Sequence, residues 1–248
     1  MKEANDTIYL SVVIPIFNEG AALKPMLADL MRELPSRFGD GFEVIIVDDA
    51  STDQSAELVK ENDGRITYIK HPTRLGSGAA RKTGTTMAKG ELCAWIDGDG
   101  TYRVADLLSM VANIGSYDQM IGVRHEEHGA FPLIRTVVKW QARKLAGLLW
   151  NCQIPDLNSG LRVSRRESML RWLHLVPAGF SCTTTATLAA ISLGQSVGYW
   201  PIAYLPRAVG SHSKFHPCKD TFKLYKTILN LRFCCRARVT SDEQRELG

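Results

Sequence analysis

The sequence predicts an α/β fold built on a mostly parallel sheet, and two observations carry this prediction. Strand-like apolar runs alternate with single helical segments of about ten residues through the first half of the chain. The runs Phe42–Val47 and Leu92–Ile96 do not alternate between polar and apolar residues, which is typical of strands buried on both faces of a sheet. Strands joined by single helices form βαβ units, whose strands lie parallel.

The expected elements follow from local patterns. Strands are indicated by β-branched and apolar runs, and helices by apolar residues at helical spacing or by stretches of small residues. In order along the first half they are strand 9–17, helix 20–34, strand 42–47, helix 51–60 with a serine or threonine cap, strand 66–70, helix 78–88 and strand 92–96.

The second half is less regular and yields fewer elements: an amphipathic helix over 136–150, a small-residue helix over 183–193, a strand over 197–204 and an amphipathic helix over 219–238. No internal repeat or low-complexity linker divides the chain. We therefore expect one domain over residues 1–218, which is long enough for an enzyme, followed by an amphipathic helix and a polar tail over 219–248.

Composition excludes several classes of protein. The chain has 248 residues, of which 45% are hydrophobic and 23% charged, as in a globular domain rather than a disordered segment. The formal net charge of +4 is too small to indicate a nucleic-acid partner, and no apolar run reaches the roughly 18 residues of a spanning helix. The N-terminus carries acidic residues where a signal peptide needs basic ones. Six scattered cysteines without CxxC spacing predict reduced thiols in the cytoplasm.

Three polar clusters follow predicted strands: Asn18-Glu19, Asp48-Asp49 and the Asp97-Gly98-Asp99 segment. Each alone could cap a helix or shape a turn. Since ligands bind at the carboxyl ends of parallel strands, the three together predict a site for a cation or a donor-rich ligand. Two carboxylates flanking a glycine can reach one Mg²⁺ or Mn²⁺ ion that also binds diphosphate oxygens. Neither a GxGxxG turn after the first strand nor a P-loop is present.

These motifs resemble those of the family 2 glycosyltransferases, which have the GT-A fold. The resemblance lies in VVIPIFNEG, VIIVDDASTDQS, RLGSGAARKTG and WIDGDGTY, and continues through GVR, DLNSGLR, FSCTTTATLAA and the segment from Arg207 to Lys214. The later motifs are similar to those of the branch that makes polyprenyl-phosphate sugars, such as dolichyl-phosphate mannose. The resemblance implies a Rossmann-like sheet flanked by helices, covering roughly residues 9–225.

The resemblance also implies roles for individual residues. The nucleotide-sugar pocket would be formed by Pro15, Phe17, Glu19, Val47, Asp49, Asp97, Gly98 and Asp99. The divalent metal would be held by Asp97 and Asp99. Thr101 stands where the family often has glutamine, so it is a weak candidate for a third ligand, which a water or His212 could replace.

The reaction implied is transfer of a hexose, mannose or glucose, from a GDP- or UDP-sugar to a polyprenyl phosphate, with inversion at the anomeric carbon. A phosphate monoester is already an anion near neutral pH, so cations matter more than a general base. The candidate cations are Arg124, Arg135, Arg207 and Lys214. With a phosphate acceptor Asp156 would orient Arg162 or a loop, whereas in relatives that glycosylate hydroxyls an acidic residue in this region acts as the base. Ser159 with Gly160 would form a tight turn against the sugar.

A polyprenyl acceptor requires work at a membrane surface. The helices 136–150 and 219–238 combine apolar residues with lysines and arginines, as interfacial helices do, although both could instead pack on the body of the protein. We therefore expect a protein peripheral on the cytoplasmic membrane face, or held there by a membrane-protein partner. Two alternatives remain: a GT-A enzyme with a soluble hydroxyl acceptor, and a non-catalytic nucleotide-binding module.

Overall fold

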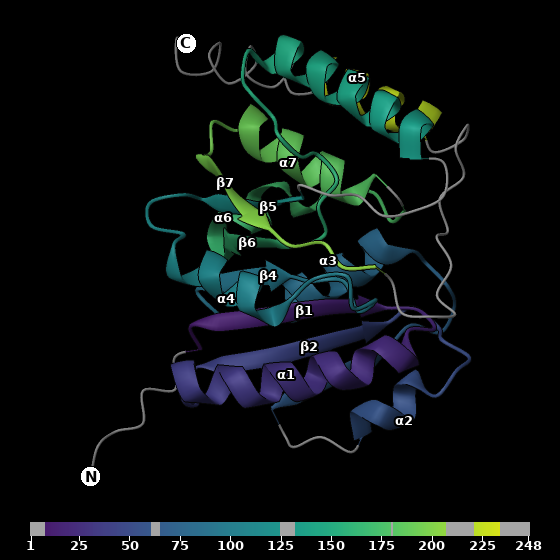
Figure 1. Cartoon of the computed structure of the whole chain (residues 1–248), viewed down its shortest axis with the longest axis vertical. Coiled ribbons are helices and arrows are strands. Elements are labelled where there is room, and N and C mark those ends of the chain that lie inside the picture. The colour runs from purple at the N-terminus through teal and green to yellow at the C-terminus, as the bar shows by residue number, and fades with distance from the viewer. Residues whose placement is uncertain (1–7, 61–64, 125–131, 180, 207–220, 234–248) are drawn as a thin grey trace, which may run out of the picture.

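A computed structural model describes residues 8–60, 65–124, 132–179, 181–206 and 221–233. Their strands form one seven-stranded sheet in the order β3-β2-β1-β4-β6-β5-β7 (Figure 1). The strands are β1 (Leu10–Ile16), β2 (Phe42–Asp48), β3 (Ile66–Lys70), β4 (Leu92–Trp95), β5 (Gln119–Arg124), β6 (Arg162–Arg165) and β7 (Val197–Ile202). β6 pairs antiparallel with β4 and β5, and every other pairing is parallel. The predicted mostly parallel α/β sheet is confirmed.

Helices cover both faces of this sheet. They are α1 (Gly20–Phe38), α2 (Ser55–Lys60), α3 (Ser77–Met87), α4 (Val104–Ala112), α5 (Pro132–Trp150), α6 (Arg166–Leu173) and α7 (Cys182–Ser192), followed by an unlabelled helix over 221–233. Because successive side chains of a strand point to opposite faces, β1 divides its residues between two cores. Val12 and Ile14 pack with α1 and α4, whereas Val13 packs on the other face with α3, α6 and α7.

A third apolar cluster joins α5 and the helix 221–233 to α7. Ala142 and Ala146 of α5 are buried in it together with Leu188 of α7 and with Leu224 and Ile228. Figure 1 shows α5 and this last helix side by side along one end of the molecule. Within the described residues, no helix combines the length and the apolar character needed to cross a bilayer. The expected division between residues 218 and 219 falls at a point outside the described residues.

Two sequence-based expectations need correction. The helix expected from Ser51 begins only at Ser55, because the amides of Ser51 and Thr52 bond to the side chains of Asp48 and Asn18 rather than starting a helix. The sequence analysis also assigned no element to β5, β6, α4 or α6. β6 is only four residues long and contains two arginines, so neither its length nor its composition marks it as a strand.

The register of the sheet gathers the predicted site at one edge. Ile16 at the end of β1 pairs with Asp48 at the end of β2, and Val13 pairs with Trp95 at the end of β4. The loops that follow these three parallel strands therefore leave the sheet side by side, which is where ligands bind in open α/β sheets.

Candidate active site

The loops after β1 and β2 hold each other through side-chain to backbone hydrogen bonds. The Asn18 amide donates to Ser51 Oγ at 2.9 Å, and Asn18 Oδ1 accepts from the Thr52 amide at 2.8 Å. Asn18 has a positive φ of 54°, a conformation that asparagine tolerates better than most residues. Asp53 accepts from the Gly20 amide at the start of α1. Asn18 and Asp53 thus stabilise the conformation of these loops, as is common for polar residues that shape turns or cap helices.

Asp49 organises the loop between β3 and α3. Its carboxylate accepts hydrogen bonds from the amides of Leu75 and Gly76, both at 2.8 Å, and lies 3.0 Å from Nδ1 of His71. Burial alone would raise the pKa of Asp49, but the hydrogen bonds from His71 and the two amides outweigh it and hold the pKa below its ordinary value. Asp49 is therefore ionised and rigidly held, and its contact with a nucleotide stays a prediction.

The other predicted pocket residues divide between strand interior and loop. Pro15 and Val47 face each other in the β1–β2 register and are buried, with the Val47 side chain in the core. Phe17 and Glu19 lie in the loop after β1 and are half-buried. The Arg74 guanidinium lies 4.1 Å from the centre of the Phe17 ring, which is the aromatic face predicted to receive a base.

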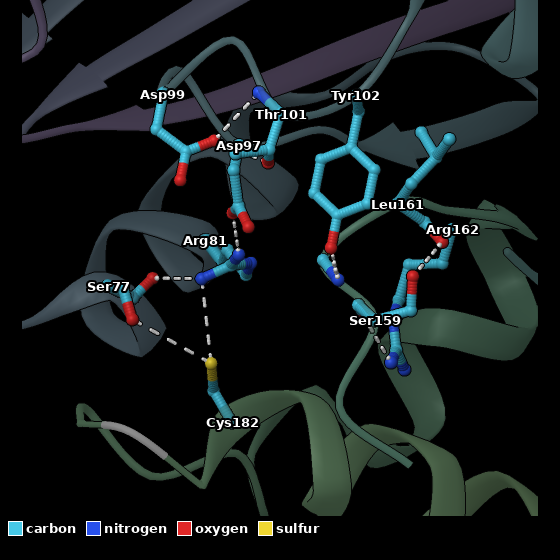
Figure 2. A network of polar contacts seen from close by, with 11 residues as sticks. Ser77, Arg81, Asp97, Asp99, Thr101, Tyr102, Ser159, Leu161, Arg162 and Cys182 are labelled. Atoms are coloured by element: carbon cyan, nitrogen blue, oxygen red, sulfur yellow. Dashed lines mark hydrogen bonds and ion pairs between the residues drawn. The ribbon is translucent and has the colours of Figure 1, made fainter. Parts of the chain in front are cut away.

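The Asp97-Gly98-Asp99 segment follows β4 directly, as predicted. Asp99 is buried, and its Oδ1 accepts from the Thr101 hydroxyl at 2.7 Å and from the Thr101 amide at 3.2 Å (Figure 2). Gly98 is required by packing, because a Cβ there would lie 2.6 Å from Cγ2 of Ile16. Thr101 thus orients Asp99, and its role as a third metal ligand stays a prediction.

Asp97 forms an ion pair with Arg81 of α3, a residue that the sequence analysis did not select (Figure 2). The Arg81 side chain is buried; one of its nitrogens lies 3.3 Å from the Ser77 carbonyl and 3.5 Å from the sulfur of Cys182. The run of small residues around Arg81 was the available sequence signal for its burial. In this run Gly78 lies so close to the loop before α7 that a Cβ would come 1.9 Å from the Pro177 carbonyl. This close approach brings Arg81 beneath the aspartates.

The donor set fits a divalent cation of the magnesium class. Asp97 and Asp99 offer carboxylate oxygens from one short loop, which are the ligands that Mg²⁺ and Mn²⁺ prefer. Within the described part of the chain, no cluster of three or more His, Cys, Asp or Glu side chains is present, so protein groups there supply two carboxylates and not a complete cage. Such sparse ligation is usual where substrate phosphates and waters complete the coordination of Mg²⁺.

Arg124 and Asp156 form a bidentate ion pair at the far side of the site. The distances are 2.8 Å from Nε to Oδ2 and 2.9 Å from Nη2 to Oδ1, and the side chains are only 8% and 10% exposed. Asp156 also accepts from the Asn158 amide, and the Arg124 guanidinium lies over Tyr204. Asp156 thus contacts its own loop and Arg124 at the end of β5, not Arg162 as expected, and its role in the reaction stays a prediction.

The Ser159-Gly160 turn lies against the aspartates. A Cβ on Gly160 would come 2.1 Å from Oδ2 of Asp97, so any larger residue at this position would displace that carboxylate. Ser159 is fully buried, and its carbonyl accepts from Arg162 at 2.8 Å. The chain bends at Gly160, but within the described residues no backbone hydrogen bond closes a tight turn there, and the contact with the sugar stays a prediction.

The remaining predicted cations are not placed by the structure. Arg207, His212 and Lys214 lie outside the described residues, and Arg135 belongs to the first turns of α5, where only the backbone is described.

Comparisons with known proteins agree with this architecture. The profile described as glycosyl transferase family 2 matches residues 11–172. A dolichyl-phosphate beta-glucosyltransferase of Dictyostelium discoideum is 34% identical, over 94% of this chain and 76% of its own length. A dodecaprenyl-phosphate galacturonate synthase of Rhizobium johnstonii is 26% identical over 93% of this chain and 68% of its own.

Among solved structures, glucosyl-3-phosphoglycerate synthase from Mycobacterium tuberculosis, crystallised with Mn²⁺, UDP and phosphoglyceric acid, superposes with a TM-score of 0.71. The match covers 91% of this chain and 78% of that chain at 17% sequence identity, which bears on the fold alone. The GT-A architecture, the paired aspartates after β4 and the family profile agree, and the chain belongs to the family 2 glycosyltransferases.

Proposed function

We propose that this enzyme transfers a hexose from a nucleotide diphosphate sugar to a polyprenyl phosphate, with inversion at the anomeric carbon. The observation that carries the proposal is the similarity to the Dictyostelium dolichyl-phosphate glucosyltransferase over 94% of the chain. In the reaction, an oxygen of the acceptor phosphate forms a bond to the anomeric carbon on the face opposite the departing nucleotide diphosphate. The bond between that carbon and the diphosphate oxygen breaks, and its electron pair leaves with the nucleotide.

The residues of this chain bind and orient the reactants. Asp97 and Asp99 would hold a Mg²⁺ or Mn²⁺ ion, which when bound neutralises charge on the diphosphate. Phe17, Arg74 and the loop fastened by Asp49 border the space proposed for the base and ribose. No strong general base is required, because the second pKa of a phosphate monoester lies near 6.

Arg124 is the described cation best placed to meet the acceptor phosphate. Asp156 fixes its guanidinium in one orientation through two hydrogen bonds, which lowers the entropy lost when a phosphate is bound. We propose that Arg207 and Lys214, from the segment before the helix 221–233, add charge at the same place. Arg135, on α5, is proposed to contact the acceptor headgroup.

We further propose that α5 and the helix 221–233 attach the enzyme peripherally to the cytoplasmic face of a membrane. Each helix buries one side in the third apolar cluster and exposes large apolar residues on the other side. We call these the exposed apolar face: Trp140 (52% exposed), Leu148 (80%), Phe222 (70%), Leu229 (43%) and Phe233 (71%).

Charge supports a lipid surface as the occupant of this face. Neither helix contains an acidic residue, and exposed lysines stand among the apolar side chains: Lys144, Lys223 and Lys226. Apolar residues interleaved with cations suit an interface that has an apolar interior and anionic headgroups. Among the described residues, Cys93, Cys152 and Cys182 form no disulfide, and a reducing compartment stays a prediction.

The reaction is tested with purified protein, Mn²⁺ or Mg²⁺, a panel of radiolabelled UDP- and GDP-hexoses and a polyprenyl phosphate in detergent. We expect metal-dependent label in the organic phase for wild type and for Asp29→Ala, an exposed aspartate of α1, but not for Asp99→Ala. Product with a β linkage from an α-linked donor would establish inversion by NMR. Label that stays in water while nucleotide diphosphate is released would instead indicate a soluble hydroxyl acceptor.

Membrane attachment is tested by sedimentation with vesicles of phosphatidylcholine alone or with one third anionic phosphatidylglycerol. We expect binding to the anionic vesicles that weakens with salt and is lost in the double variant Phe222→Ser/Phe233→Ser. The control Leu170→Ser/Leu193→Ser removes two exposed leucines from α6 and the residue after α7, and should bind like wild type. Wild-type protein that stays in the supernatant would refute direct lipid binding and favour a membrane-protein partner.

A further inference from the structure

Arg162 is a buried cation without an acidic partner in the described part of the chain. Its side chain is fully buried, and its hydrogen bonds go to the Ser159 carbonyl at 2.8 Å and to the Thr187 hydroxyl at 3.3 Å. The Nε of Arg162 has no hydrogen-bond partner there, and the guanidinium lies 5.8 Å from the Trp95 ring. Burial, and then the neighbouring charge of Arg81, lower the pKa of Arg162 to about 10, so the group is still a cation near neutral pH.

Such a residue is costly for stability alone. A buried charge that lacks an acidic partner loses hydration without a full Coulombic return, and an apolar side chain of similar volume is often equally or more stabilising at such a position. The reason for a charged residue at this position must therefore lie in the groups that its guanidinium contacts.

Arg162 and Tyr102 hold the two polar groups of the peptide unit between Ser159 and Gly160, Arg162 through the Ser159 carbonyl and Tyr102 through the Gly160 amide. The Gly160 amide donates to the hydroxyl oxygen of Tyr102 at 2.8 Å, and burial raises the pKa of Tyr102 above its usual range, so this phenol stays neutral. Figure 2 shows Tyr102, Ser159 and Arg162 beside the loop of Asp97 and Asp99. The turn is thus fixed from the sheet by Arg162 and from the loop after β4 by Tyr102.

The Ser159-Gly160 turn also limits the position of the Asp97 carboxylate. A Cβ added to Gly160 would lie 2.1 Å from Oδ2 of Asp97 and 2.7 Å from its Cγ, so the glycine backbone stands directly against this carboxylate. On another side, Arg81 forms its ion pair with Oδ1. The carboxylate therefore has a cation at one oxygen and a rigid backbone turn at the other.

We propose that Arg162 is a positioning residue that, together with Tyr102, holds the Ser159-Gly160 turn against Asp97 and so sets the orientation of this carboxylate toward a divalent cation and the donor diphosphate. The inference rests on the proposed function, because it assigns Asp97 to the metal and the nucleotide. Arg162 itself touches neither. Its effect reaches the site through the backbone of the turn.

The test combines thermal unfolding with the dissociation constant of Mn²⁺, measured by electron paramagnetic resonance in the presence of UDP. In Arg162→Met, the unfolding midpoint is expected to stay the same or rise while the dissociation constant increases about tenfold, as for residues that orient a metal ligand. Arg162→Lys, whose ammonium can still donate to Ser159, should recover part of this loss. Thr185→Val is the matched control, since Thr185 is a buried residue of α7 whose hydroxyl has no partner within the described residues; its Mn²⁺ affinity should not change.

Tyr102→Phe provides a second variant, because it removes only the oxygen that accepts from Gly160. A weaker Mn²⁺ affinity at an unchanged unfolding midpoint would support the proposal even if Arg162→Met does not fold. Wild-type affinity in folded Arg162→Met, or in Tyr102→Phe, would overturn the positioning role while leaving the proposed function intact. A wild-type protein that binds UDP but no Mn²⁺ would overturn both the positioning role and the metal dependence.

Discussion

The buried Arg124–Asp156 pair, placed by our proposal on the acceptor side of the site, allows a quantitative test of what this pair contributes to stability. Asp156→Asn keeps the size of the side chain and its bond to the Asn158 amide, but removes the negative charge that lies 2.8 and 2.9 Å from the Arg124 guanidinium. Breaking a buried ion pair by changing one partner costs about 3–5 kcal/mol. The side chains of Arg124 and Asp156 are 8% and 10% exposed, and asparagine still offers one acceptor. We therefore expect Asp156→Asn to lower the free energy of unfolding by about 3 kcal/mol, the low end of this range.

This loss has a measurable thermal signature. For a chain of this size, each kcal/mol shifts the unfolding midpoint by roughly 2–4 °C, so Asp156→Asn should lower it by roughly 6–12 °C in calorimetry. Asp29→Asn removes the negative charge from a surface pair in which the side chains of Arg32 and Asp29 are 67% and 50% exposed, and should leave the unfolding midpoint close to that of wild type.

The double variant Arg124→Met/Asp156→Asn separates a lost attraction from an uncompensated charge. Because the cost of Asp156→Asn arises mainly from a buried guanidinium that has lost the charge of Asp156, removing that guanidinium should restore at least half of the lost stability. If the double variant is no more stable than Asp156→Asn, or if Asp156→Asn unfolds within 2 °C or so of wild type, the account of this pair as a buried electrostatic unit is refuted.

Three further predictions follow from other contacts. Arg74→Ala should weaken UDP binding about two- to fivefold in calorimetric titration, because the guanidinium stacked 4.1 Å from the Phe17 ring centre contributes a cation–π contact and positive charge; unchanged affinity would remove Arg74 from the pocket. The pKa of Asp49 is lower in the folded than in the unfolded state, so its contribution to stability is present above its ordinary pKa of 3.8 and is lost as the pH falls through the folded value. Urea unfolding between pH 7 and pH 3 should therefore show a shallower acid loss in Asp49→Asn, and an identical slope would contradict this. Gly78→Ala should cost at least about 3 kcal/mol or prevent folding, because its Cβ would meet the Pro177 carbonyl at 1.9 Å, whereas Gly179→Ala, with nothing within 4 Å, should cost under about 0.5 kcal/mol by the same urea assay.

Much of the fold could be predicted because β1, β2 and β4 are buried on both faces and are therefore largely apolar. The predicted strands 9–17, 42–47, 66–70 and 92–96 correspond to β1–β4, and the loops after three of them carry the polar clusters. β6 could not be predicted in this way. Its sequence, Arg-Val-Ser-Arg, has no strand signature, and it is a strand because β4 and β5 supply partners on both sides.

The candidate site divides in the same manner. Asp97 and Asp99 are identifiable because a carboxylate pair around glycine at the end of a buried strand is a local pattern. Arg81 and Arg162 are not identifiable, because an arginine in a sequence is far more often a solvated surface residue than a buried one. Arg81 matters because of Asp97, which lies 16 residues away in the chain. Arg162 matters because β6 pairs with β4, which places Arg162 near the loop that follows β4.

Residues adjacent in the chain were therefore enough to predict the class of fold and a carboxylate pair at the end of a buried strand, which is the candidate site. Which cation meets which carboxylate depends instead on the packing of distant elements. Asp156 pairs with Arg124 and not with Arg162, and Asp97 pairs with Arg81, because charged groups shielded from water pair with whatever opposite charge the packing of distant elements brings within reach. That pairing is a property of crossing strands and helices, and no local pattern encodes it.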